Sequence, residues 1–274
     1  MVSYRGFDNV KLRLAGLVKD EPEPQPQPEP EPQPEPRPAP AHGYTPLMEL
    51  DAEQHAPQDG MIQTAGSDPQ VFRLQNGATH ATDGVPRYVL PGSSSDRLVS
   101  TGAGALFRGA SSVTILMWMR PQAPKGDKGI FTTSMLGTDA GTNEFWLRFD
   151  AAGFNSGGAN LMRTFFSMRS GHETATGTAP AAGEWSQVGL RFDGAAGNGR
   201  AILNGAFAAI AAGQNGGAPS VVWNGPDRLS LGDGAIPGET RITADIALAR
   251  VYRQALTEAE VAQEYEADRV RFGL

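Results

Sequence analysis

Every second residue between positions 21 and 40 is a proline, which gives ten prolines in twenty positions. Each proline fixes φ, lacks a backbone N–H and biases the preceding residue toward extended geometry, so this segment can form neither a helix nor a sheet. At about 3.1 Å per residue, we expect residues 21–40 to form a semi-rigid polyproline II spacer about 60 Å long, within a stalk that spans residues 20–43. Repulsion between its acidic side chains favours this extension. A disordered tether without a fixed length is the alternative.

The residues before the stalk, 1–19, are too few to bury a core of their own. Apolar residues alternate at Val10, Leu12 and Leu14 among basic ones, which fits a short strand as well as a helix. We expect a docking peptide that becomes ordered on a larger assembly, such as the capsid or spike protein of a particle. A disordered tail is the alternative.

The composition excludes several classes of protein. With 23 Lys+Arg against 30 Asp+Glu, the net charge of −7 argues against a nucleic acid partner, because phosphate recognition needs a clustered basic surface. The absence of Cys excludes disulfides, thiolate metal sites and a Cys nucleophile, which leaves oxygen-ligated ions. No run of eighteen apolar residues predicts a membrane span, and the first residues lack the apolar core of a signal peptide. We therefore expect synthesis in the bacterial cytoplasm without a Sec signal.

Residues 44–274 contain many short strand patterns separated by Gly, Asn and Asp. Residues 112–120 are apolar on both faces, which predicts a strand buried between two layers. Along residues 144–150, Phe145, Leu147 and Phe149 share one face, and the residues between them, including Trp146, share the other. The pair Asn204-Gly205 predicts a tight hairpin. Further strands are expected at residues 164–169, 187–192, 200–203, 207–211, 229–231 and 244–252.

One helix is predicted, near the C-terminal end. Thr257 and Glu260 have the spacing of a capping box, and an apolar stripe runs through about residue 268, formed by Ala259, Val261, Ala262 and Tyr265. The acids of this helix are expected on a solvated face: Glu258, Glu260, Glu264, Glu266 and Asp268. We expect the helix to pack on the side of a sandwich or to close its base.

These patterns predict an all-β fold, a two-sheet antiparallel sandwich with one C-terminal helix, preceded by an extended polyproline linker. Trp118 and Trp185 lie in strand patterns and are expected in its core. Residues 44–84 are expected to add opening strands and an ordered cover.

Five segments follow one another in an order typical of a known family: VTILMWMRP at 113–121, GEWSQVGLRFDG at 183–194, GRAILNG at 199–205, LSLG at 229–232 and IALARVYRQALTEAE at 246–260. Over about residues 85–270 the chain resembles the laminin-G-like, concanavalin A-like lectin/glucanase superfamily. The resemblance implies that residues 44–274 form a jelly roll of two antiparallel sheets, one of them curved, with a concave face that often binds carbohydrate.

Catalysis is not expected. Glucanases of this superfamily use two carboxylates that face one cleft, and a retaining pair lies about 5 Å apart. No predicted strand carries such a pair, since Glu144 and Asp150 are six residues apart. The chain also lacks a Gly-x-Ser-x-Gly motif, and its four His show no metal-ligand spacing. We therefore expect a non-enzymatic binding protein.

A sugar site combines a stacking aromatic with planar polar side chains that contact hydroxyls. Trp146 is the first stacking candidate, because alternation puts it on the polar face of its strand, and Trp223 is the second. A Trp146 covered by another layer is the alternative. The expected hydroxyl partners are Asp139, Asn143, Arg148, Arg169, His172, Asn215, Asn224 and Asp233.

Calcium is the cofactor that the resemblance suggests. The resemblance implies that some relatives bind it at the sandwich rim, and loop oxygens are available from Asp139, Asp227 and Asp233. Their spacing matches no calcium-loop motif, so no metal ligands are assigned.

The order of docking peptide, stalk and lectin-like head is typical of an extended adhesin. A sugar-binding head without an export signal can reach an exterior surface on a particle that is assembled in the cytoplasm and released by lysis. We therefore predict a head-fibre, spike or tail-fibre protein of a phage or phage-like particle, such as a gene transfer agent, which binds host capsular or surface polysaccharide. Many copies would raise the avidity of weak single sites.

Two alternatives stay open at this point. The jelly roll could be a structural or protein-binding module that has lost its sugar site, including one that forms a homo-oligomer, because laminin-G-like domains do both. The chain could also be a bacterial surface protein that is exported by a signal-independent route.

Overall fold

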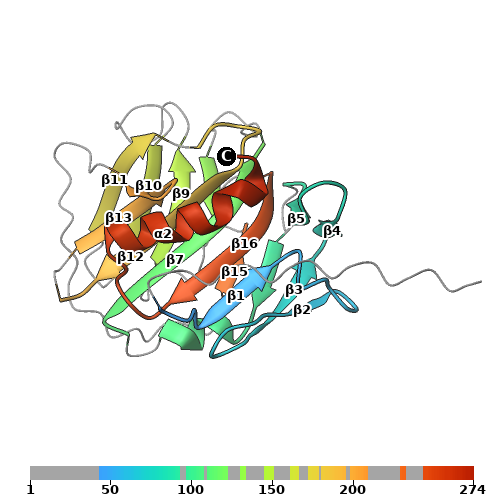
Figure 1. Cartoon of the computed structure of the whole chain (residues 1–274). Helices are drawn as coiled ribbons and strands as arrows, with labels where there is room; N and C mark the ends of the chain where they lie inside the picture. Colours follow the sequence, from blue (N-terminus) through green and yellow to red (C-terminus); the bar gives the residue numbers. More distant parts are fainter. Residues whose placement is uncertain are drawn as a thin grey trace, which may run out of the picture. The chain divides into compact units, whose positions relative to one another are not determined.

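The computed structural model describes residues 43–92, 97–107, 110–122, 130–133, 145–150, 161–166, 172–178, 180–195, 198–208, 229–232 and 243–274. Figure 1 shows these residues as layered β-sheets with one long helix across them. The predicted docking peptide and the stalk up to residue 42 lie outside the described residues.

The largest sheet has eight antiparallel strands. Its order is β14-β13-β12-β7-β16-β5-β4, and β1 pairs with the part of β16 that β5 leaves unpaired. The bounds are β1 Met48–Asp51, β4 Thr79–Ala81, β5 Arg87–Leu90, β7 Ser112–Pro121, β12 Ser186–Asp193, β13 Asn198–Leu203, β14 Ala206–Phe207 and β16 Ala244–Tyr252.

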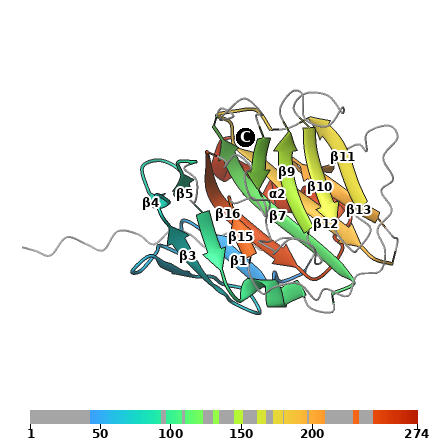
Figure 2. The same ribbon diagram turned by 180° about the vertical axis from the view of Figure 1, so that it is seen from behind.

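The second layer consists of two four-stranded antiparallel sheets, which lie in front of the large sheet in Figure 2. One has the order β15-β6-β3-β2, with β2 Met61–Gln63, β3 Val71–Gln75, β6 Arg97–Ser100 and β15 Leu229–Leu231. The other has the order β11-β10-β9-β8, with β8 Ile130–Thr133, β9 Phe145–Asp150, β10 Leu161–Phe166 and β11 His172–Thr178. A 3-10 helix, η1, spans Ala103–Phe107.

The predicted β-sandwich is confirmed, and residues 44–84 contribute β1 to β4 to it. The layer that was expected as one sheet is divided into two. Several strand boundaries also differ from the prediction. The strand expected at 164–169 is β10, Leu161–Phe166, and the described part of the strand expected at 207–211 is only the two-residue β14. Strands β8 and β11 were not predicted.

Strand β7 explains how the layers are held together. Val113, Ile115, Met117 and Met119 are buried in the main core, which also contains residues of the β15-β6-β3-β2 sheet. The alternate residue Trp118 lies in a separate buried cluster beneath the C-terminal helix. The strand is therefore covered on both faces, as its apolar sequence predicts, but the cover on one face is a helix.

The predicted helix is α2, Glu258–Asp268, followed by the 3-10 helix η2, Arg269–Phe272. The capping box is confirmed, because Glu260 N–H donates to Thr257 Oγ1 at 3.3 Å and Thr257 N–H donates to Glu260 Oε2 at 2.7 Å. In the described part of the chain, neither α2 nor any other helix is long and apolar enough to cross a bilayer.

The face that α2 presents to the sheet differs from the predicted one. Val261, Glu264 and Asp268 are buried, whereas Ala259 is exposed. The expected placement of Glu264 and Asp268 on a solvated face was wrong. Both carboxylates have partners in the sheet, described below, and these partners compensate for their removal from water.

The Asn204-Gly205 hairpin is also confirmed, with φ of +48° and +79° at its two residues. Gly205 has a second role, because a Cβ added there would lie 2.8 Å from the Cβ of Tyr265 in α2. The glycine thus allows both the turn and the close approach of the helix.

Candidate ligand-binding face

The sheet of β8 to β11 carries those predicted binding residues that the structure describes. In β9, Trp146 stands opposite Phe165 of β10, which stands opposite Glu173 of β11. Two residues further along β9, Arg148 stands opposite Arg163 of β10. Paired positions share a face of a sheet, and so do positions two residues apart in one strand. Trp146 and Arg148 therefore belong to one face, which we call the Trp146 face.

The register separates charged from apolar positions across this sheet. The Trp146 face comprises Ile130, Thr132, Trp146, Arg148, Asp150, Leu161, Arg163, Phe165, Glu173 and Ala175. It holds every Asp, Glu and Arg of the four strands. The opposite face comprises Phe131, Thr133, Phe145, Leu147, Phe149, Met162, Thr164, Phe166, His172, Thr174 and Thr176. This segregation is typical of an antiparallel sheet with one core-facing side and one solvated side, and from this pattern we expect the Trp146 face to be the solvated side.

The register brings together only some of the predicted site residues. Trp146 and Arg148 share the Trp146 face, whereas His172 stands opposite Phe166 in a row of the other face. Sequence reasoning missed Arg163, Phe165 and Glu173, which the strand pairing adds to the Trp146 face. The remaining candidates lie outside the described residues: Asp139, Asn143, Arg169, Asn215, Trp223, Asn224, Asp227 and Asp233.

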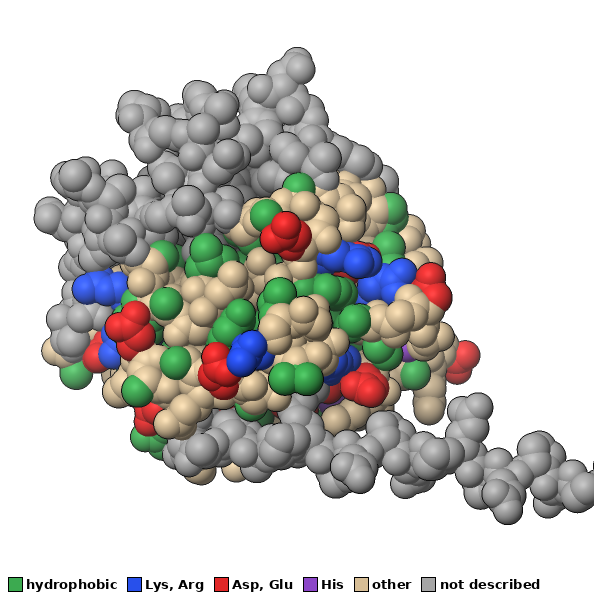
Figure 3. All heavy atoms as spheres, turned by 45° about the horizontal axis from the view of Figure 1, so that its top comes forward, with side chains coloured by type: hydrophobic (Ala, Val, Ile, Leu, Met, Phe, Trp, Pro, Cys, Tyr) green, Lys and Arg blue, Asp and Glu red, His purple; other side chains and the backbone are tan. Residues whose placement is uncertain are grey.

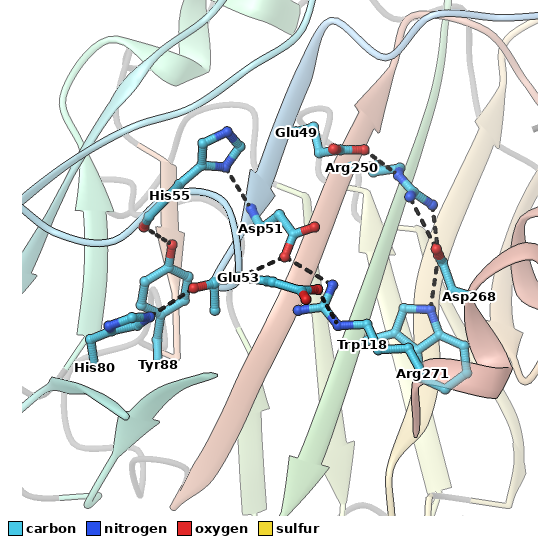
Figure 4. Close-up of polar contacts among 11 residues, drawn as sticks. Glu49, Asp51, Glu53, His55, His80, Tyr88, Trp118, Arg250, Asp268 and Arg271 are labelled. Atoms are coloured by element: carbon cyan, nitrogen blue, oxygen red, sulfur yellow. Dashed lines mark hydrogen bonds and ion pairs between the residues drawn. The ribbon is translucent and has the colours of Figure 1, made fainter. Parts of the chain in front are cut away.

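A second set of polar residues lies between α2 and the large sheet, and Figure 4 shows most of it. Arg250 of β16 is buried; its Nε donates to Glu49 Oε2 at 2.6 Å, and its Nη1 donates to Asp268 Oδ2 at 2.6 Å and also to Glu264. Tyr252 donates its hydroxyl proton to Glu264, and Trp118 Nε1 donates to Asp268 Oδ2 at 3.2 Å. We call these six residues the Arg250 cluster.

The electrostatics of the Arg250 cluster keep its donors protonated. Burial by itself lowers the pKa of Arg250, but the carboxylates of Asp268, Glu264 and Glu49 outweigh burial and hold that pKa well above its ordinary value. Burial raises the pKa of Tyr252 far above its usual range, so its hydroxyl remains a donor to Glu264. The cluster joins β1, β16, β7 and α2 through groups that already have partners, which makes it an anchor for the helix.

A third polar group surrounds the turn after β1 (Figure 4). His55 Nδ1 accepts from the Asp51 N–H at 2.9 Å, and Tyr88 donates its hydroxyl proton to the carbonyl of His55 at 2.7 Å. His80 Nε2 donates to the carbonyl of Ala52 at 2.7 Å. On the other side of Asp51, Arg271 Nη1 lies 2.9 Å from the Asp51 Oδ1. These contacts fix the turn to β5 and to η2.

The described residues were also compared with the requirements of a metal site and of a basic binding surface. None of their His, Asp and Glu side chains form a group of three or more that could hold a metal ion. On the molecular face drawn in Figure 3, described Arg side chains are interspersed with Asp and Glu and form no continuous basic field.

Protonation of His55 is expected to make the stability of the domain depend on pH. Burial lowers the pKa of His55 below its ordinary value, against the opposing effect of Asp51 and Glu49. The folded domain therefore takes up a proton at His55 less readily than the unfolded chain, and protonation of Nδ1 removes its hydrogen bond from Asp51. Stability attributable to His55 is present above a pH of about 6.5 and is lost as the pH falls through the lowered pKa.

We expect the free energy of unfolding to fall between pH 7.5 and pH 5.5, and the variant His55→Asn to reduce this fall, because the Asn oxygen can accept from Asp51 without titrating. Urea unfolding at several pH values measures both slopes. Equal slopes in the wild type and the variant would contradict this role of His55.

Comparisons with known proteins identify the family and the fold. Residues 93–262, more than half of the chain, match the family model of the concanavalin A-like lectin/glucanases superfamily of laminin-G type. No curated protein matches the sequence.

Several similar solved structures are receptor-binding domains of botulinum neurotoxins. The type G domain superposes with a TM-score of 0.57 at 10% identity over 81% of this chain and 51% of its own. A structure of the type C neurotoxin, whose cell entry is described as dependent on interaction with two ganglioside molecules, has a TM-score of 0.59 at 10% identity over 81% of this chain and 51% of its own. The binding domain of botulinum neurotoxin DC in complex with rat synaptotagmin II has a TM-score of 0.61 at 11% identity over 81% of this chain and 51% of its own.

The present chain spans about half the length of these domains, and at such low identity the likeness concerns the fold alone. The family match covers β7, β12, β13, β15, β16 and the first part of α2, the elements that carry the segments quoted from the sequence. The chain belongs to the concanavalin A-like lectin/glucanase superfamily.

Proposed function

We propose that this chain is a non-enzymatic carbohydrate-binding adhesin whose sandwich binds surface polysaccharide through the Trp146 face. The observation that carries this proposal is the register of β9 and β10. It puts Trp146, two Arg and two acidic residues on one side of a sheet whose other side has mainly apolar and Thr positions. An aromatic that can stack on a sugar ring, next to planar groups that contact hydroxyls, is the composition of a sugar site.

The family and the fold support binding rather than catalysis. The superfamily includes lectins as well as glucanases, and the similar structures are receptor-binding domains, one described with gangliosides and one in complex with a protein. On the Trp146 face, Asp150 and Glu173 are separated by the row that contains Arg148 and Arg163. Within the described strands of this face, these acids do not form the adjacent carboxylate pair that a retaining glycosidase needs.

The second part of the proposal concerns the particle on which the adhesin acts. The proline-rich segment follows a short amphipathic segment and precedes the sandwich, an order that suits display of a binding head at a distance from an assembly. We place the chain on the surface of a virion or phage-like particle, such as a gene transfer agent, with residues 1–19 as the attachment to a capsid or spike protein. Host capsular polysaccharide is then the ligand, and many displayed copies supply the avidity.

The test is binding of the full chain to a glycan array and to intact bacterial capsule, with calcium and with a chelator. We expect saturable binding that falls about two- to tenfold in Trp146→Ala, because an aromatic stack contributes about 0.5–1.5 kcal/mol. Tyr44→Ala is the matched control, since it removes a partly exposed aromatic from the start of the domain and leaves the Trp146 face intact.

Two outcomes would overturn the proposal. The first is absence of binding to any glycan or capsule when the chain is multimerised on streptavidin to restore avidity. The second is glycan binding that Trp146→Ala leaves unchanged. Binding to a protein alone would favour the second candidate function, a protein-docking module, for which the synaptotagmin complex of a similar domain is the supporting observation.

A further inference from the structure

Strands β2 and β3 share a solvated face that carries apolar as well as polar side chains. Met61 and Gln63 of β2 are exposed, and the buried Ile62 lies between them. They stand opposite Arg73 and Val71 of β3, which are exposed too. We call these four exposed residues the β2–β3 face, on which Met61 and Val71 are 41% and 44% exposed. Exposed apolar side chains that are neighbours on one face indicate a surface that binds a partner.

The outer edge of β2 offers little room for an added strand. The backbone of Met61 donates to and accepts from that of Gln58, at 2.9 and 2.8 Å. Further along, the backbone of Ala65 exchanges the same two bonds with Glu49, at 2.9 and 2.8 Å. These contacts block the edge on both sides of Gln63. We therefore expect a partner to contact the side chains of the β2–β3 face and not to extend the sheet.

One charge of each sign lies unpaired at this face. Within the residues that the structure describes, neither the Arg73 guanidinium nor the Asp59 carboxylate has a hydrogen bond or an ion pair, and both residues are exposed. Asp59 is in the turn before β2, and this turn stays next to β3 because Leu74 N–H donates to the Gly60 carbonyl at 2.9 Å. Six other described arginines do form ion pairs: Arg87, Arg120, Arg191, Arg250, Arg269 and Arg271.

This pattern of charge makes the β2–β3 face complementary to itself. In an interface around a two-fold axis, residue i of one copy contacts residue j of the other, and j contacts i. Two copies that meet in this way can place each Arg73 opposite the other copy's aspartate in the turn before β2. One cation and one anion on the same surface then form two ion pairs, with the apolar side chains between them.

The chain enters the head beside this face. Ser67 N–H donates to the Pro46 carbonyl at 3.0 Å, and Asp68 N–H donates to the Leu47 carbonyl at 2.8 Å, just before β3 begins. Copies that are attached to one assembly through residues 1–19, as proposed above, are held near one another. Such tethering raises the effective concentration of one head at the next, so that a weak contact between heads is populated.

We propose that the β2–β3 face is an interface between two copies of this chain around a two-fold axis, with Met61 and Val71 at its centre and Arg73 paired with Asp59 of the partner subunit. Met and Arg are enriched in interfaces between proteins. Stable interfaces have about 20–30 residues a side, far more than this face, so the pairing is weak and depends on tethering. Paired heads would present two copies of any binding face at a fixed spacing.

Cysteine cross-linking tests the interface in the full chain, which contains no Cys of its own. The chain is biotinylated at its N-terminus and bound to streptavidin, which holds several copies together. Val71→Cys is compared with Val270→Cys, the same change at a 75% exposed position of η2. With a short bis-maleimide, we expect Val71→Cys to cross-link about tenfold faster, because pairing raises the local thiol concentration. Equal rates would overturn the interface, since tethering is the same in both variants.

Exchange of charge tests the pairing of Arg73 with Asp59. In the Val71→Cys background, Arg73→Glu and Asp59→Lys each put like charges at both contacts, and each should lower the cross-linking rate to about that of Val270→Cys. A mixture of the two variants, one of them carrying a mass tag, should restore cross-linking in the mixed pair only, because both of its contacts again join opposite charges.

Controls keep this test decisive. Circular dichroism establishes that each variant is folded. If Asp59→Lys does not fold, Arg73→Glu mixed with the unexchanged chain provides the test, since one of its two contacts stays favourable and an intermediate rate is expected. Single variants that cross-link at the original rate, or a mixed pair that is not restored, would overturn the paired charges. No saccharide is present, so these outcomes are independent of the proposed function.

Discussion

Replacing Arg250 with Ala is expected to lower the free energy of unfolding of the sandwich by about 3–5 kcal/mol, because removal of one partner from a buried ionic cluster leaves uncompensated charge. Arg250 is the only Arg of the Arg250 cluster, and it contacts the carboxylates of Glu49, Glu264 and Asp268. Glu264 and Asp268 are almost inaccessible to solvent, at 0% and 1% exposure. Without Arg250 these two acids must become protonated, admit water or leave the interface together with α2.

Urea unfolding followed by far-UV circular dichroism measures the loss. Arg269→Ala is the matched control at the end of the same helix; its ion pair with Glu266 is exposed, and its removal should leave the midpoint unchanged. A further variant tests the cause. Arg250→Met combined with Glu264→Gln and Asp268→Asn should be more stable than Arg250→Met alone, because the triple variant has no unpaired buried charge at these positions. A loss below about 1 kcal/mol for Arg250→Ala would contradict the anchoring role of the cluster.

The Arg250 cluster also shows where sequence reasoning ends. The strand at 244–252 and the helix with its capping box follow from local patterns, and both were predicted within a residue or two. Glu264 and Asp268, by contrast, were assigned to a solvated face because helical acids usually are exposed. Only the tertiary position of Arg250, on the face of β16 that α2 covers, reverses that assignment.

The register shift in β16 is a second feature that the sequence pattern does not reveal. Its pairing with β7 shifts register between Ile246 and Leu248, so the alternation of core-facing residues changes there. Ala244 and Ile246 face the main core before the shift, and Ala249 and Val251 face it afterwards. A bulge of this kind leaves no clear mark in an Ala-rich apolar strand, because both faces of the strand are buried.

The candidate site was predictable in part for the same physical reason. Alternation along 145–150 is a property of one strand, so the placement of Trp146 with Arg148 could be deduced from sequence. The position of Arg163 opposite Arg148 depends on how β9 pairs with β10, and strand pairing is set by tertiary packing and turn geometry. The expected strand at 164–169 left Arg163 outside, although its alternation with Phe165 was a signal that could have been used.

The second large effect is expected at Trp118, whose replacement with Ala should destabilise the domain by about 3–5 kcal/mol. Trp118 is 1% exposed and stacks on Phe272 of η2, with ring centroids 4.2 Å apart, and on Tyr265 of α2 at 5.4 Å. Truncation would therefore open a cavity between β7 and the C-terminal helices. It would also remove the indole donor to Asp268.

The variant Trp118→Phe separates these two contributions, since it keeps an aromatic ring at the site and removes the indole N–H. We expect its loss in urea unfolding to be clearly smaller than that of Trp118→Ala, with near-UV circular dichroism reporting the altered packing of the aromatic rings. Val270→Ala, at a position of η2 that is 75% exposed, is the control and should have little effect. If Trp118→Phe were as destabilising as Trp118→Ala, the hydrogen bond to Asp268 and the fit of the full indole would hold the C-terminal helices in place. If both variants were neutral, the aromatic cluster would not contribute to docking the helices, and the Arg250 cluster would be their main attachment to the sheet.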